Sequence, residues 1–204
     1  MMNTVVLPEH DEVVARVGAV EQEEGWLAAC EHHGDYLVLT RPLVESLAQF
    51  LKQLGNGRVL EVGGGSGVLA EALDACGVKM IATDPGAAVG SMVQRMDGRT
   101  ALRRFQPRVV LGSFVPFDSK VDEAVLGCSS VTHYLVLNAR LGGAMGSEFM
   151  WRSRGWTATP LQEISRWMIT RHDVWMGKGR SLLRHGEAWH MENVKGKKLG
   201  DIRS

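Results

Sequence analysis

The order of apolar and polar positions predicts alternating strands and helices through the middle of the chain. Short apolar runs that are typical of buried strands occupy 59–62, 78–83, 108–111 and 133–138, and a further short strand is expected at 91–95. Segments with helical spacing lie between them, at 68–75, 100–105 and 118–127. This alternation predicts a parallel sheet with helices packed on its faces.

The N-terminal part of the chain is charged and has a helical pattern. Valines recur at helical spacing in 9–30, at positions 13, 14, 17 and 20. A second helix is predicted over 43–54, and it starts near Thr40 and Arg41 because Pro42 favours the first turn of a helix. We expect this part to form a helical cap on the core.

The region after the last predicted strand has a different composition. Residues 139–160 are rich in glycine and include Trp151 and Trp156. Flat rings on such a backbone suit a lid over an aromatic or apolar substrate, and the alternative is that they pack the terminal strands onto the sheet. For Trp167 and Trp175 we expect packing.

A glycine cluster follows the strand predicted at 59–62. Residues 58–67 read RVLEVGGGSG, with Glu61 two positions before the first glycine. Because glycine has no Cβ, a turn of this kind lets the backbone lie against a flat ligand. Asp84 ends the next predicted strand, where its carboxylate can accept hydrogen bonds from the hydroxyls of a ribose.

The spacing of the glycines separates two classes of cofactor. It is G-x-G-x-G, whereas a dinucleotide fingerprint is G-x-G-x-x-G, and Val68 stands where that fingerprint has its third glycine. Glu61 would repel a pyrophosphate but suits the ammonium of an amino-acid ligand. With Asp84 in register, the pattern resembles the class I S-adenosylmethionine-dependent methyltransferases over about residues 41–138. A dinucleotide reductase is the alternative for the motif.

The resemblance implies a doubly wound, mostly parallel, seven-stranded α/β sheet and S-adenosylmethionine as the cofactor. The glycine loop would lie along the methionine and ribose. The cofactor-binding positions that it implies are Glu61, Gly63, Gly65, Gly67, Asp84, Pro85, Asp97 (for the adenine amino group), Ser113 and Phe114. Arg41 is expected to bind the methionine carboxylate, or else to solvate a helix start, with Tyr36 or His33 closing over the cofactor.

The strand predicted at 108–111 leads into a loop that resembles the acceptor loop of methyltransferases acting on exocyclic amines. Those loops read Asn, Asp or Ser, then two prolines and an aromatic residue, whereas this one has extra residues and a single proline. We expect Ser113, Pro116 and Phe117 to lie at the methyl acceptor. A loop that only covers the cofactor is the alternative.

A catalytic base is needed only if the acceptor atom starts protonated. We expect His133 in this role, with the pair His172-Asp173 and His33 as alternatives, since histidine titrates near neutral pH. Each also has a structural interpretation, as a strand cap, a sheet residue or part of a turn. The sequence contains no Cys-x-x-Cys or His-Glu-x-x-His motif, so no metal is expected.

Charge and cysteine content narrow the classes of partner. The 23 basic residues equal the 23 acidic ones, which favours neither nucleic acid nor a membrane surface as a partner. The three cysteines, Cys30, Cys76 and Cys128, are far apart in apolar stretches and indicate reduced thiols in the cytoplasm. No leader or membrane span is evident.

We expect one domain in 1–204, with a helical cap and a first long helix (1–57), a cofactor-binding core (58–138), a substrate-side lid with terminal strands (139–192) and a flexible tail (193–204). The expected function is methyl transfer to N or O of a small molecule. The alternatives are an RNA or protein methyltransferase with a basic groove near 114–118, and a catalytically silent cofactor-binding scaffold that acts through a partner protein. A homodimer is compatible with the sequence.

Overall fold

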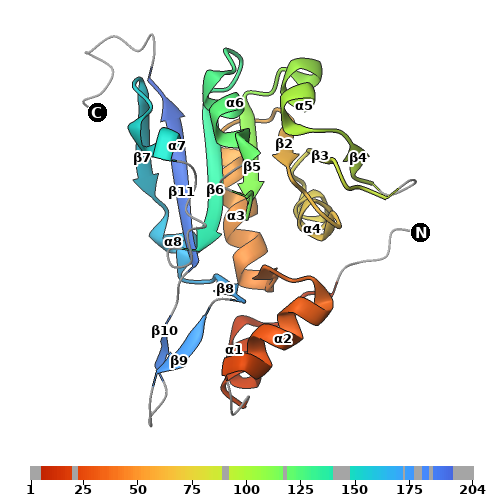
Figure 1. The fold of residues 1–204 in the computed structure, drawn as a ribbon, viewed down its shortest axis with the longest axis vertical. Helices are drawn as coiled ribbons and strands as arrows, with labels where there is room; N and C mark the ends of the chain where they lie inside the picture. Colours follow the sequence, from red (N-terminus) through yellow and green to blue (C-terminus); the bar gives the residue numbers. More distant parts are fainter. Residues whose placement is uncertain are drawn as a thin grey trace.

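A computed structural model arranges the predicted core strands in a seven-stranded sheet (Figure 1). The structure describes residues 6–19, 23–88, 92–116, 119–139, 148–171, 173–176, 181–183 and 186–194. In spatial order the strands are β4 (Gln94–Arg95), β3 (Met80–Asp84), β2 (Val59–Val62), β5 (Val109–Ser113), β6 (His133–Ala139), β11 (Gly186–Asn193) and β7 (Trp156–Pro160).

The direction of the strands makes this a doubly wound sheet. Strands β4, β3, β2, β5 and β6 pair in parallel, and β11 pairs antiparallel with both β6 and β7. The chain adds β3 and β4 on one side of β2 and then returns to add β5 and β6 on the other, so the winding reverses between β2 and β5. The expected fold class, a doubly wound and mostly parallel seven-stranded α/β sheet, is confirmed.

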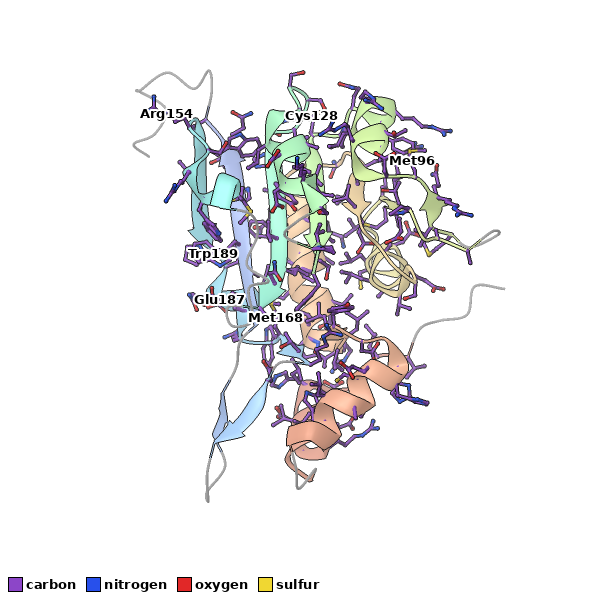
Figure 2. All side chains as sticks on the ribbon, viewed as in Figure 1. Met96, Cys128, Arg154, Met168, Glu187 and Trp189 are labelled. Carbon is purple, nitrogen blue, oxygen red and sulfur yellow. The ribbon has the colours of Figure 1, made fainter. Side chains whose placement is uncertain are left out.

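Helices cover both faces of the sheet and enclose two cores (Figure 2). The first core lies under α3 (Arg41–Gln53), α4 (Val68–Ala75) and α8 (Gln162–Ser165), and the second under α5 (Gly98–Phe105), α6 (Val121–Gly127) and α7 (Glu148–Arg152). Alternate residues of a strand face opposite sides. In β6, Leu135 and Leu137 therefore enter the first core, whereas Tyr134 and Val136 enter the second.

The predicted helical cap consists of α1 (His10–Ala19) and α2 (Glu23–His33), which lie beyond the end of the sheet toward which β6 points (Figure 1). Val13 and Val17 are buried against Ile169, so the helical spacing of the valines is explained by a small core of its own. A two-stranded sheet of β1 (Leu37–Val38) and β8 (Ile169–Thr170) joins the cap to the C-terminal part, and Trp26 Nε1 donates to the carbonyl oxygen of Thr170 at 3.1 Å.

The described part of the glycine-rich region forms regular structure. Trp156 begins β7, is 8% exposed and donates from Nε1 to the carbonyl oxygen of Leu126 at 3.2 Å, so it follows the packing alternative and not the lid. Trp151 lies on α7 with its ring edge-to-face against that of Trp189, 4.9 Å between centroids, and Trp189 lies at the outer strands (Figure 2). Trp167 packs against the first core, as expected. Residues 140–147 and the side chain of Trp175 lie outside the described residues.

A hairpin of β9 (Val174–Met176) and β10 (Ser181–Leu183) precedes β11. The first strand of this hairpin begins at Val174, shortly after β8. Among the helices that the structure describes, none combines the length and the apolar character needed to cross a bilayer.

Candidate functional site

A cavity of about 560 Å³ opens at the carboxyl ends of β2, β3 and β5. The glycine turn after β2 and Asp84 line one side of it, and Ser113, Phe114 and Pro116 line another. Residues 6–7, which precede α1, and residues 34–39, which follow α2 and include β1, also border it. In doubly wound sheets ligands bind at this edge, beside the point where the winding reverses. The cavity is thus where the topology leads one to expect a ligand.

The glycine turn holds three residues in the left-handed region, Gly63 (φ 71°), Gly65 (φ 52°) and Gly67 (φ 85°). Side chains of L-residues are strained there. A Cβ on Gly65 would meet no atom of the described residues within 4 Å, so this backbone faces the open cavity. A Cβ on Gly67 would lie 2.5 Å from Cγ2 of Val93, so Gly67 leaves room for the segment just before β4 to pack against this turn. Gly65 is therefore the position at which a ligand can lie against bare backbone.

Asp84 is anchored to the glycine turn. Its Oδ2 accepts a hydrogen bond from the amide of Gly65 at 3.0 Å, and its Oδ1 accepts one from the amide of Gly86 at 2.7 Å. A carboxylate oxygen can accept more than one hydrogen bond. Both oxygens therefore keep capacity for a donor in the cavity that Asp84 lines, such as a ribose hydroxyl.

Glu61 is a buried carboxyl group on the cavity wall, 1% exposed. Burial, and then the charge of Asp84, raise the pKa of Glu61 from its ordinary 4.5 to about 7. Its Oε2 has no hydrogen-bond partner among the described residues. A Cβ on Gly64 would lie 3.0 Å from that oxygen, so the glycine leaves room for it. A buried polar atom without a partner is costly, and a ligand with N–H donors would satisfy it.

Phe114 directly follows β5 and has a strained backbone conformation, with φ 51°. Its amide donates to the carbonyl oxygen of Leu137 at 2.8 Å, and its ring lies 5.8 Å from the ring of Tyr36. A residue other than glycine in this region is uncommon, and such strain is concentrated at functional sites. Arg171 lies over Tyr36, with 3.6 Å from its guanidinium carbon to the ring centroid. Sequence reasoning did not identify Arg171, because its partner is far away in the chain.

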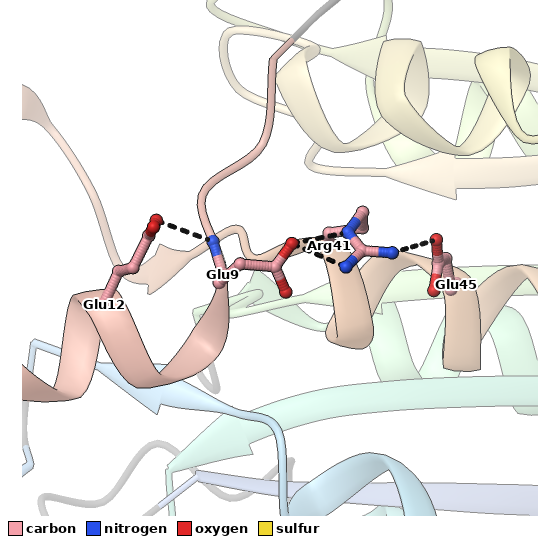
Figure 3. A network of polar contacts seen from close by, with 4 residues as sticks. All are labelled: Glu9, Glu12, Arg41 and Glu45. Carbon is pink, nitrogen blue, oxygen red and sulfur yellow. Dashed lines mark hydrogen bonds and ion pairs between the residues drawn. The ribbon is translucent and has the colours of Figure 1, made fainter.

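Arg41 is paired with carboxylates of the N-terminal part (Figure 3). Its Nη2 lies 2.6 Å from Glu9 Oε1, its Nε donates to the same oxygen at 2.7 Å, and its Nη1 lies 3.5 Å from Glu45 Oε1. The hydrogen bond to Glu9 and the charge of Glu9 raise the pKa of Arg41. Its backbone amide also donates to the carbonyl oxygen of Pro8 at 2.9 Å. Arg41 does not line the cavity but fastens the segment whose residues 6–7 border it.

Asp97 and Pro85, both expected at the cofactor, do not line the cavity in the described structure. Asp97 caps α5, where its Oδ1 accepts from the amide of Thr100 at 2.9 Å, and this hydrogen bond lowers its pKa. Pro85 follows Asp84 in the turn that Gly86 completes. The carboxylate before a glycine thus acts here as a helix cap.

The expected base, His133, begins β6 and so lies at the amino end of the parallel strands, opposite the cavity. Its Nδ1 is 3.0 Å from Nε2 of His190. This position leaves His133 out of the candidate site. His33 ends α2 and does not line the cavity. The carboxylate of Asp173 accepts hydrogen bonds from the amide and the hydroxyl of Thr170, each at 3.0 Å.

Phe117 and His172 lie outside the described residues, so their predicted roles remain predictions. Within the described ranges, no group of three or more His, Cys, Asp or Glu side chains could hold a metal ion.

No protein-family model and no curated protein matches this chain. Solved structures that are similar in fold include an S-adenosylmethionine-dependent methyltransferase from Agrobacterium tumefaciens (11% identity, TM-score 0.44), which aligns over 76% of this chain and 63% of its own. Magnesium protoporphyrin IX methyltransferase from Synechocystis aligns over 74% of this chain and 77% of its own, with 14% identity and a TM-score of 0.44. An O-methyltransferase from Thermotoga maritima aligns over 85% of this chain and 72% of its own, with 8% identity and a TM-score of 0.49. This chain thus spans less than two thirds of the Agrobacterium protein, and the likeness concerns the fold alone.

Proposed function

We propose that this protein is a class I methyltransferase that binds S-adenosylmethionine in the cavity at the carboxyl ends of β2, β3 and β5. The observation that carries the proposal is the Oε2 of Glu61, which has no hydrogen-bond partner among the described residues and is buried on the wall of a cavity whose bare backbone is at Gly65. A ligand with an ammonium group and a flat nucleoside satisfies both features.

The residues at the cavity fit the parts of this cofactor. Glu61 would bind the ammonium, and its raised pKa, about 7, would fall as the positive charge approaches. Asp84 would accept the ribose hydroxyls while its bonds to Gly65 and Gly86 hold it in place. When bound, S-adenosylmethionine supplies a methyl group activated by a positively charged sulfur.

For the acceptor we propose a small molecule that is methylated on N or O. Ser113 and Pro116 line the cavity beside Phe114, which supports their predicted place at the acceptor. Direct displacement at a methyl group depends mainly on alignment of the two atoms and exclusion of water. The chain contributes to both through the apolar residues of 34–39 and 113–116 that border the cavity.

A second candidate, methylation of RNA, is favoured by one observation. The segment 95–108 carries exposed arginines and a single carboxylate, Asp97, which caps α5. In the described part of the chain, none of these arginines forms an ion pair with a carboxylate. The arginines are Arg95, Arg99, Arg103, Arg104 and Arg108. The basic groove expected near 114–118 has no lysine or arginine among the described residues that line the cavity. RNA would therefore have to approach along α5.

The protein would work with reduced thiols in the cytoplasm as one domain, consistent with the free thiols of Cys30, Cys76 and Cys128.

Incubation with methyl-labelled S-adenosylmethionine and fractionated cell extract tests these proposals. Label in a small molecule supports the first candidate and label in RNA the second. Cofactor binding without transfer would point to a scaffold. Calorimetric titration with S-adenosylhomocysteine and with NADH separates the cofactor classes, and binding of NADH alone would overturn the proposal.

A further inference from the structure

We propose that Tyr36 is the platform on which the methyl acceptor stacks, and that the acceptor is therefore a planar aromatic molecule. This inference rests on the proposed function, because it concerns the part of the same cavity that lies beyond Glu61, Gly65 and Asp84.

Tyr36 presents a large aromatic surface at the cavity. It lines the cavity and is 47% exposed, whereas the other tyrosine of the chain, Tyr134, is fully buried. The ring of Phe114 lies beside it at 5.8 Å with an angle of 40° between the planes, so the two rings are not stacked on each other. Aromatic rings prefer offset-stacked or edge-to-face partners, and a flat ligand can take up that role against Tyr36.

The Tyr36 ring is held by the C-terminal part of the chain. The Arg171 guanidinium covers it at 3.6 Å, and the Tyr36 carbonyl oxygen accepts from the amide of Arg171 at 3.2 Å. The pairing of Leu37 with Thr170 continues this contact into β1 and β8. A ring that is already ordered loses little entropy when a ligand binds. The cation also draws electron density from the ring, which favours an electron-rich aromatic partner.

The strained backbone of Phe114 places the second ring. Its φ of 51° is maintained by the hydrogen bond of its amide to Leu137, and its neighbour Ser113 lines the cavity as well. The acceptor platform thus combines the cap, the exit of β5 and the segment after β8. Because Glu61 and Asp84 belong to the cofactor part, the two halves of the cavity can be tested separately.

The two tyrosines allow a direct test by NMR. Protein with labelled tyrosine rings is saturated with S-adenosylhomocysteine and then titrated with 2-naphthol or with its saturated counterpart, decahydro-2-naphthol. We expect 2-naphthol to shift the ring signals of Tyr36 by its ring current, and Tyr134 to serve as an unmoved reference. Tyr36→Phe assigns the signal. If 2-naphthol leaves Tyr36 unshifted, or if the saturated alcohol shifts it equally, the inference is overturned.

Two variants separate the aromatic character of the Tyr36 side chain from its size. Tyr36→Leu should weaken binding of 2-naphthol by about tenfold, the effect expected for loss of one stacking surface. Tyr36→Phe should bind it as the unchanged protein does, and both should keep the affinity for S-adenosylhomocysteine. Equal binding of 2-naphthol by Tyr36→Leu would refute the platform while leaving the proposed function intact. Failure of the unchanged protein to bind S-adenosylhomocysteine would instead refute the proposed function.

Discussion

Asp84 accepts a hydrogen bond from the amide of Gly65 at 3.0 Å, which joins the turn after β3 to the turn after β2. The two turns belong to neighbouring parallel strands, whose register pairs Val62 with Thr83. The glycine loop and the acidic residue are therefore positioned together before any ligand arrives. Such preorganisation reduces the entropy that a ligand loses on binding.

Replacing Asp84 by alanine should weaken binding of S-adenosylhomocysteine by roughly 1.5–3 kcal/mol, because hydrogen bonds to a charged group are lost. Isothermal titration calorimetry measures the effect. Asp74→Ala is the matched control, since Asp74 is an exposed carboxylate on α4 that does not line the cavity. Unchanged affinity in Asp84→Ala would remove Asp84 from the site.

Gly65→Val should abolish cofactor binding, because its side chain would occupy the space that the ligand needs. The fold should survive with a cost of about 1–2 kcal/mol from the left-handed backbone, since no atom in the part of the chain that the structure describes lies within 4 Å of the new Cβ. Circular dichroism and chemical denaturation report the fold, and calorimetry reports the binding. Gly57→Val, at a turn that is equally open but far from the cavity, should bind normally. Binding by folded Gly65→Val would contradict the approach of the ligand to this loop.

Local patterns in the sequence predicted the centre of the fold well. The strand at Val59–Val62 and the helix at Val68–Ala75 have the expected bounds, and Asp84 ends β3 as expected, because apolar runs and glycines act through neighbouring residues. Where the geometry of a preceding loop sets the start of an element, the observed bounds differ from the predicted ones. The helix expected from 118 begins at Val121, after Lys120 with φ 57°.

The site predictions that depend on distant residues fared differently. The surroundings of Arg41 depend on Glu9, and those of Tyr36 on Arg171, which no local spacing reveals. The position of His133 was available from the sequence, because the first residue of a parallel strand lies at the edge away from the ligand. The role of Asp97 was ambiguous, since a carboxylate before glycine serves a turn, a helix cap or a ligand equally well.

If RNA is the acceptor, reversing charge on α5 should weaken its binding. Arg103→Glu with Arg104→Glu should lower the affinity for a short single-stranded RNA and reduce the slope of affinity against salt concentration. Fluorescence anisotropy at several salt concentrations measures both. Lys52→Glu with Lys79→Glu makes the same charge change at exposed positions outside this segment and is the control. If both pairs behave alike, or if RNA does not bind at all, the second candidate is excluded.

Arg41 and Glu9 should act on cofactor binding as a pair. Because both side chains are about half exposed, we expect Arg41→Gln and Glu9→Gln each to weaken binding only slightly, through loosening of the segment that borders the cavity. The double variant should be no weaker than either single one. Calorimetry distinguishes this indirect effect from direct binding of the methionine carboxylate by Arg41. If Arg41 bound the carboxylate directly, Glu9→Gln would free the guanidinium and strengthen binding.

Glu61 should make the ligand-free protein less stable as the pH rises. Its pKa is about 7 in the folded chain and near 4.5 when unfolded, so the folded state holds the proton more tightly. The contribution of protonated Glu61 to the free energy of unfolding is therefore fully present below pH 4.5. It is lost as the pH rises through 7, and the loss amounts to up to about 3 kcal/mol. Urea denaturation between pH 4.5 and 8 measures this, with Glu61→Gln as the reference that cancels other titrating groups. The variant should match the unchanged protein at the acid end and exceed it at pH 8. Parallel pH profiles would mean that Glu61 is ionised normally, and the buried carboxyl could then not be the group that awaits a cation.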